Sequence, residues 1–155
     1  MDIGTAIKTC FSKYAVFSGR AARSEYWYFG LFTFLVCIAI MVLSLVVAAM
    51  GNGSGLTVGI ARGFAFLGIF FMPIAAYGLV VLLPSLSVTV RRFHDLGVSG
   101  WFLLLFMVLA CIPVINFLAG LAQLIWFCMP GTSGDNKYGP NPLAGNPALP
   151  AENKA

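Results

Sequence analysis

The chain has 155 residues, of which 60% are hydrophobic and 9% are charged, and its formal net charge is +4. Ordinary soluble domains are about 25% charged, and a chain this short cannot hide so much apolar surface in one aqueous core. The composition therefore excludes an ordinary soluble domain and predicts an all-helical protein that crosses a membrane several times. The positive charges lie at the ends of apolar segments, so we expect anionic lipid as the partner and no nucleic acid.

The first segment, residues 3–17, carries apolar side chains at helical spacing. This pattern predicts a short helix that lies in the membrane interface. A frayed lead-in without a stable helix is the alternative. Because about 25 residues precede the first long apolar block, we expect that block to stay as an anchor and not to be removed with a signal peptide.

Three uncharged blocks exceed the roughly 20 residues needed to cross the hydrocarbon core of a bilayer. They comprise residues 26–50, 64–90 and 101–129. Residues 51–55 are rich in glycine and are expected to form a flexible connector. Pro73 and Pro84 lie in the second block, where each removes a helical hydrogen-bond donor and is expected to bend the helix.

The third block is too long for one straight crossing, since a helix over residues 101–129 would measure about 43 Å against a core of about 30 Å. Pro113 and Asn116 interrupt its middle. The chain either folds back there as a hairpin, which gives four membrane segments, or continues as one kinked and tilted helix. The distribution of lysine and arginine places the N-terminus in the cytoplasm in both cases and slightly favours the hairpin.

The first polar motif covers residues 18–25. Arg20 and Arg23 lie three residues apart, on one face if they are helical, where two guanidinium groups can meet phosphates. Glu25 stands at the start of the first block, which suits the positive end of a helix dipole. An orientation signal combined with a helix cap is the alternative to a specific lipid site.

The second polar motif lies at the connection between the second and third blocks and contains Arg91, Arg92, His94 and Asp95. Asp95 is expected to hold the only histidine in one tautomer or to raise its proton affinity. A catalytic centre needs further converging groups, so we expect a structural hydrogen-bonding role for His94 and no enzyme activity. The four cysteines lack metal-ligand spacing, and we expect no metal, disulfide or cofactor.

The third polar motif is the turn at residues 134–140, which follows the third block directly. Its Asp, Asn and Tyr side chains can cap neighbouring helix ends. If the tail returns to the N-terminal side, Asp135 joins the other acids beside the arginines. The expected lipid- or partner-binding residues, called the polar cluster below, are Arg20, Arg23, Glu25, Arg91, Arg92, His94, Asp95, Asn136 and Tyr138.

The three motifs, in residues 14–27, 84–101 and 136–140, together resemble a small bacterial inner-membrane family catalogued as domain of unknown function 805. The resemblance covers roughly residues 5–142. It implies a multi-pass helical protein of the bacterial cytoplasmic membrane, and it supplies no reaction, substrate or cofactor. We expect residues 1–142 to form one membrane domain, followed by a flexible tail at 143–155.

The leading functional expectation is a non-enzymatic membrane protein whose cytosolic, arginine-rich face binds anionic lipid headgroups or a protein, which includes a second copy of the chain. A small transporter or channel component is an alternative, because proline-broken helices can expose backbone groups to a solute. Ionisable residues are absent deep within the blocks, which counts against ion-coupled transport. A membrane enzyme that uses His94 with Asp95 or Glu25 is the third and least favoured hypothesis.

Overall fold

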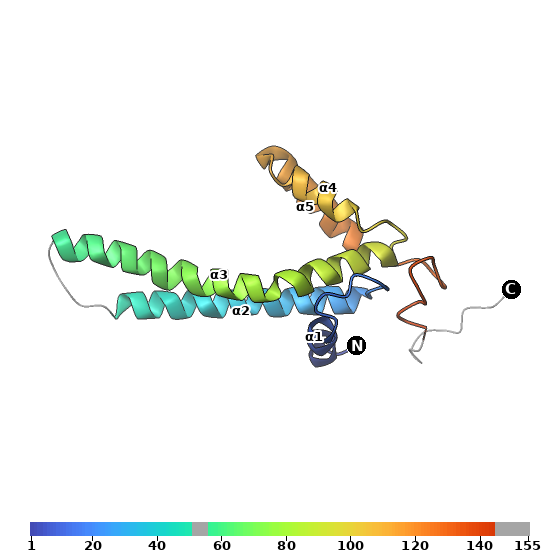
Figure 1. The fold of residues 1–155 in the computed structure, drawn as a ribbon, viewed down its shortest axis with the longest axis horizontal. Helices are drawn as coiled ribbons and strands as arrows, with labels where there is room; N and C mark the ends of the chain where they lie inside the picture. Colours follow the sequence, from blue (N-terminus) through green and yellow to red (C-terminus); the bar gives the residue numbers. More distant parts are fainter. Residues whose placement is uncertain (51–55, 145–155) are drawn as a thin grey trace.

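A computed structural model describes residues 1–50 and 56–144 of the chain. In this part five helices follow one another: α1 (Ile3–Ser12), α2 (Arg23–Ala49), α3 (Leu56–Asp95), α4 (Phe102–Leu109) and α5 (Pro113–Cys128). The all-helical expectation is therefore confirmed. Figure 1 shows α2 and α3 as a long antiparallel pair, with α1 beside one end of it and the α4–α5 hairpin leaving the pair at that same end. The connector 51–55 and most of the expected flexible tail lie outside the described residues.

Helix α1 ends at Ser12, five residues before the end that its apolar spacing predicts. Asp2 caps its first turn by accepting from the backbone N–H of Thr5 at 3.2 Å, and the hydrogen bonds from Thr5 lower the pKa of Asp2. Beyond the helix, the Ser87 hydroxyl donates to the carbonyls of Lys13 and Val16 at 3.0 and 2.7 Å. A helix that continued to residue 17 would have used the Lys13 carbonyl internally, so the bonds from Ser87 of α3 favour a non-helical conformation after α1.

Helices α2 and α3 each contain a segment long and apolar enough to cross a membrane, Arg23–Ala49 and Leu67–Asp95. Helix α3 extends beyond both ends of the block predicted at 64–90. The second polar motif therefore forms its last turns instead of a connection between helices. The helix ends after Asp95 because Gly97, with φ of 78°, closes a Schellman motif: its N–H donates to His94 O, and Val98 N–H donates to Phe93 O.

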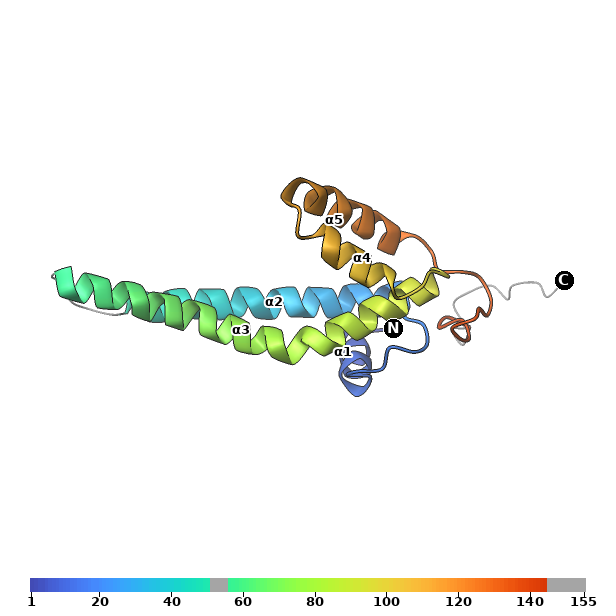
Figure 2. The ribbon, with the colours of Figure 1, turned by 45° about the horizontal axis from the view of Figure 1, so that its top comes forward.

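Pro73 and Pro84 both lie inside α3, which continues as one helix across each of them. Figure 2 shows α3 bent along its length, the usual effect of proline within a helix. The helix is therefore not unwound at Pro73 or Pro84, and the break in the apolar blocks lies before Pro113, between α4 and α5.

Helices α4 and α5 run in opposite directions and are joined by residues 110–112 (Figure 2). Pro113 is the first residue of α5, a position where its missing N–H has no helical partner to lose. Asn116 N–H donates to Ile112 O at 2.7 Å and closes the first turn. Of the two interpretations of the third block, the structure has the hairpin and not the single kinked helix.

Aromatic side chains attach the base of this hairpin to the α2–α3 pair. The Phe93 ring of α3 lies 4.8 Å from Phe127 and 5.9 Å from both Phe106 and Trp126. The Tyr26 ring of α2 lies 4.8 Å from Phe127. The Phe93–Phe106 rings are stacked, and the other three pairs are edge-to-face. Aromatic pairs of these kinds add about 0.5–1.5 kcal/mol each beyond simple burial. They fix the end of α5 next to the start of α2 and the end of α3.

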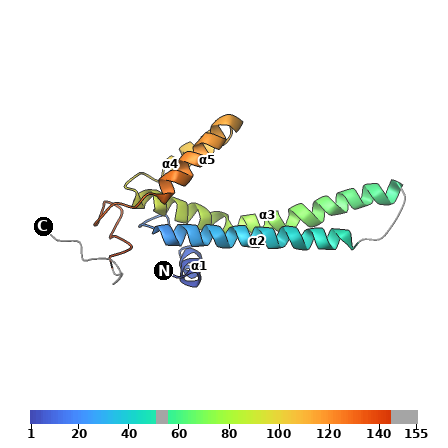
Figure 3. The same cartoon turned by 180° about the vertical axis from the view of Figure 1, so that it is seen from behind.

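The tail after α5 returns to the end of the α2–α3 pair where α1 lies, as Figures 1 and 3 show from opposite sides. Arg20, just before α2, donates to the carbonyl of Gly134 in the tail at 2.6 Å. The segments that carry the three polar motifs therefore meet at one end of the molecule.

Candidate functional site

Three arginines and two carboxylates pair inside this end of the helix bundle. Arg91 Nη1 lies 2.5 Å from Glu25 Oε1, Arg20 Nε lies 2.9 Å from Asp95 Oδ1, and Arg92 Nη1 pairs with Asp95 Oδ2. All five side chains are at most 5% exposed. The Asp95 carboxylate thus holds one arginine on each oxygen, and two of the three pairs join residues more than 60 positions apart in the chain.

Two arginines donate hydrogen bonds to the backbone carbonyls at the C-terminal end of α5. Arg92 Nη2 donates to the carbonyls of Phe127 and Met129 at 3.0 and 2.5 Å, and Arg23 Nη1 donates to Cys128 O at 3.4 Å. The last carbonyls of a helix have no partner within it, and cations are favourable at that end of the helix dipole. These bonds therefore tie the returning arm of the hairpin to α2 and α3.

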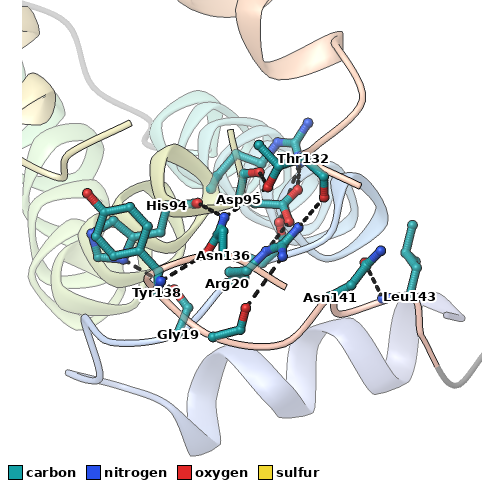
Figure 4. A network of polar contacts seen from close by, with 12 residues as sticks. Gly19, Arg20, His94, Asp95, Thr132, Asn136, Tyr138, Asn141 and Leu143 are labelled. Carbon is teal, nitrogen blue, oxygen red and sulfur yellow. Dashed lines mark hydrogen bonds and ion pairs between the residues drawn. The ribbon is translucent and has the colours of Figure 1, made fainter. Parts of the chain in front are cut away.

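The tail caps the end of α3, as expected for the turn at 134–140. Thr132 N–H donates to Asp95 O at 2.8 Å, and Asn136 Nδ2 donates to His94 O at 3.0 Å. Arg20 Nη2 in turn donates to Thr132 O at 2.6 Å. Figure 4 shows these bonds as one network around Arg20 and Asp95.

His94 does not interact with Asp95 as the sequence suggested. Its Nδ1 lies 3.2 Å from Gly19 O, and its ring stacks on Tyr138 with the two planes 4° apart and their centres 3.9 Å apart (Figure 4). Consecutive residues of a helix point in different directions, so Asp95 faces the arginines while His94 faces the 18–19 turn and the tail. The expectation that Asp95 sets the tautomer of His94 is wrong.

The expectation that the four arginines form an exposed face is also wrong for three of them. Arg20 is 7% exposed, and Arg91 and Arg92 are fully buried, whereas Arg23 is exposed. The paired carboxylates and backbone carbonyls make this burial tolerable. Arg20 and Arg23 do not share a helix face either, because α2 begins at Arg23. Asp135 stays outside the ion pairs and accepts from Asn141 N–H at 3.1 Å.

Gly131 and Thr132 belong to the site, and sequence reasoning did not identify them. A Cβ at Gly131 would overlap the Asp95 carboxylate, at 2.8 Å from Oδ1 and closer to Oδ2. Only glycine therefore lets the tail pass this carboxylate. The sequence signal, a Pro-Gly-Thr run directly after an apolar block, is shared with many ordinary turns and does not single out these residues.

A cavity of about 180 Å³ opens beside the cluster, and we call it the headgroup-side pocket. Three arginines line it against a single carboxylate, together with Ala22 and residues of the tail. The lining residues are Arg20, Ala22, Arg23, Arg92, Asp95, Pro130, Gly131, Thr132, Ser133, Asn141 and Leu143. The buried Nε of Arg92 has no hydrogen-bond partner among the described residues. The three arginines outnumber the one carboxylate, so the pocket wall carries excess positive charge.

Cys10 borders the Arg91–Glu25 pair, and its Sγ lies 3.9 Å from Glu25 Oε1. Burial of the thiol, together with the Glu25 carboxylate, raises the pKa of Cys10 to about 12. Because the thiolate is the reactive form, about one thiol in ten thousand is reactive at pH 8. A variant whose only cysteine is Cys10 should therefore react with iodoacetamide far more slowly than one that retains only the exposed Cys128.

Mass spectrometry of the alkylated protein measures both rates. Unfolding in dodecyl sulfate should make the two rates similar, which is the control for the reagent. Equal rates in the folded proteins would contradict the buried position of the thiol.

Comparison with known proteins agrees with the membrane character of the chain. It is 35% identical over 133 residues to "Inner membrane protein YhaI" of Escherichia coli K12, a match that covers 86% of this chain and 91% of the relative. It is 33% identical over 133 residues to "Inner membrane protein YhaH" of the same organism, which covers 83% of this chain and 88% of the relative. No solved structure matches the chain significantly.

A family model described as "Protein of unknown function (DUF805)" matches residues 14–140. This span contains the three polar motifs and all the ion pairs described above. The family resemblance expected from the motifs is confirmed. The chain belongs to the DUF805 family and is an inner-membrane protein with helical membrane spans.

Proposed function

We propose that this protein is a non-enzymatic membrane protein that binds the phosphate group of an anionic lipid in the headgroup-side pocket. The observation that carries the proposal is the charge of that pocket, where Arg20, Arg23 and Arg92 face one carboxylate. Guanidinium groups bind phosphate oxygens through paired, charge-assisted hydrogen bonds. The buried ion pairs hold two of the arginines in place before a lipid arrives.

Arg23 is the residue most available to a ligand. Its side chain is exposed, and its hydrogen bond to Cys128 O is long at 3.4 Å. Arg20 and Arg92, by contrast, are fixed by Asp95. Binding would therefore need a rearrangement of Arg23 alone, which keeps the ordering cost of association small.

The non-enzymatic part of the proposal is supported by the surroundings of His94. Its Nδ1 forms a hydrogen bond with Gly19 O, and Tyr138 stacks on one side of its ring. The neighbouring carboxylate of Asp95 is paired with two arginines. A catalytic centre needs further converging groups, and the Asp95 carboxylate is not available to His94, so this arrangement favours a structural role.

The same proposal includes a position in the membrane. Helices α2 and α3 cross the bilayer, while α4 and α5, at about 12 and 24 Å, fall short of a core of about 30 Å and form a re-entrant hairpin. With the tail on the N-terminal side, the lysines and arginines near the membrane divide seven to one in favour of that side. The positive-inside rule then makes that side cytoplasmic.

A compartment-sensitive reporter fused after Leu143 is the test of this orientation. We expect activity in the cytoplasm for this fusion and also for one truncated after Gly97, because the hairpin returns to the side from which it left. Periplasmic activity of the longer fusion would contradict the re-entrant hairpin.

The lipid proposal is tested with Arg23→Gln. Because one basic group near an anionic surface contributes about 1 kcal/mol, we expect roughly fivefold less phosphatidylglycerol on the purified variant, measured by native mass spectrometry. Lys13→Gln is the matched control, since Lys13 is an exposed cation on the same side that does not line the pocket. An unchanged amount of phosphatidylglycerol on Arg23→Gln would overturn the proposal. If a co-purifying protein is lost from the variant while the lipid remains, the site binds a protein partner instead.

A further inference from the structure

We infer that the ligand of the headgroup-side pocket is an intact phospholipid and that one of its acyl chains lies in an apolar groove between α2 and α3. This inference rests on the proposed function and names the ligand class of the same site. It follows from a second cavity, from its alignment with the first, and from the chemistry of its walls.

The second cavity, called the acyl groove below, has a volume of about 340 Å³. Its walls come from two helices, and the eight lining residues comprise four aromatic or aliphatic residues, three serine or threonine residues and one glycine. They are Tyr26, Phe29, Gly30, Thr33 and Phe34 of α2, and Ser85, Val88 and Thr89 of α3. The Thr89 hydroxyl donates to Ser85 O at 2.7 Å, so this hydroxyl requires no polar ligand.

The groove and the pocket follow one another along the same faces of both helices. On α2, Arg23 lines the pocket, and Tyr26 and Gly30 line the groove three and seven residues later, which is one face of a helix. On α3, Arg92 lines the pocket, and Val88 lines the groove one turn earlier. The distance along α2 from Arg23 to Gly30 is about 10 Å. A ligand with a phosphate at one end and an apolar chain at the other fits this order.

The direction of the groove also fits a lipid. From Arg23, helix α2 leaves the polar end of the molecule and enters its uncharged length. A phospholipid in a bilayer is oriented in the same way, with its phosphate at the surface and its acyl chains toward the middle. A soluble anion would use the pocket and leave the groove unoccupied, whereas a helix of another protein would not supply the phosphate that the arginines match.

Gly30 offers a way to block the groove without touching the arginines. A Cβ at this position would meet no other atom within 4 Å, so a larger side chain has room to project into the groove. Gly78 of α3 is a matched control, because it is also helical, also has open space around its Cβ position, and does not line the groove. The test therefore compares Gly30→Trp with Gly78→Trp in the full chain.

Two phosphatidylglycerols distinguish the groove from the pocket: the long-chain dioleoyl form and the water-soluble dihexanoyl form. We expect Gly30→Trp to weaken binding of the long-chain lipid about tenfold, since lost contact with two methylene groups is sufficient for that change. Binding of the short-chain lipid should stay within about twofold of the parent protein, because this lipid depends on its headgroup. Gly78→Trp should bind both lipids as the parent does, and Arg23→Gln should weaken both.

Long-chain binding by Gly30→Trp that equals that of Gly78→Trp would overturn the acyl groove and leave the headgroup proposal standing. Unchanged binding of both lipids by Arg23→Gln would overturn the headgroup proposal itself. If Gly30→Trp accumulates in the membrane at lower levels than Gly78→Trp, Gly30→Leu and Gly78→Leu replace the pair and are judged by the same comparison.

Discussion

Asp95→Asn is expected to lower the free energy of unfolding by about 3–5 kcal/mol, the range for removing one partner of a buried ion pair. The Asp95 carboxylate is 5% exposed and is the anion for both Arg20 and Arg92. An amide in its place leaves two buried cations without a counter-charge and turns an N–H group toward one of them. Arg20 also donates to the carbonyls of Thr132 and Gly134, so the tail is expected to detach when Arg20 loses its partner.

Denaturant unfolding in detergent, followed by circular dichroism, measures this effect. Asp135→Asn makes the same chemical change at an exposed residue, which accepts a hydrogen bond from the backbone N–H of Asn141. It is expected to change the free energy of unfolding by less than about 0.5 kcal/mol. If Asp95→Asn unfolds at the same denaturant concentration as Asp135→Asn, the double ion pair does not stabilise the fold.

The Arg91–Glu25 pair is expected to give the second large effect, with a loss of about 3–5 kcal/mol for either Glu25→Gln or Arg91→Gln. Arg91 is fully buried, and its Nε and Nη2 have no hydrogen-bond partner in the described part of the chain. The ion pair with Glu25 is therefore the main interaction that offsets the burial of Arg91. Removal of either charge leaves the other alone between α1, α2 and α3.

A double-mutant cycle separates this charge effect from simple loss of packing. The double variant, with Gln at both positions, has no unpaired buried charge and should lose less than the sum of the two single variants, by about 0.5–3 kcal/mol. Arg23→Gln is the control for removing an exposed arginine. It loses one long hydrogen bond to Cys128 O and should cost less than about 1 kcal/mol. Additive losses around the cycle would show that the two side chains do not stabilise each other.

Part of this fold could be predicted from particular residues of the sequence. Pro113 takes the first position of α5, where proline is favoured, and the fold-back at this residue was one of the two alternatives. The choice between them needed the packing of Phe127 against Tyr26 and Phe93, which involves three separate segments. The end of α3 was harder to predict from the sequence. The motif at 91–95 contains no helix breaker, and the helix continues through it to the Gly97 cap.

The burial of the arginines was not readable from the sequence. The sequence around Arg20, Arg91 and Arg92 looks the same as that of a basic motif that is exposed at the membrane surface. Their partners are Glu25 and Asp95, and most of these contacts cross between α2, α3 and the tail. Which side of a helix faces its neighbour depends on how the helices pack, and a one-residue rotation would exchange Asp95 for His94.

The amino-acid sequence by itself determined the membrane setting, the long helices and the family, because apolar length, periodicity and short motifs are local properties of the chain. Only the tertiary structure decided that three arginines are buried, that His94 pairs with Gly19 and Tyr138, and that Arg23 alone remains exposed beside the pocket. The physical reason is that a guanidinium group can be buried only where a carboxylate and free carbonyls reach it. Here those groups belong to segments up to 119 residues away in the chain.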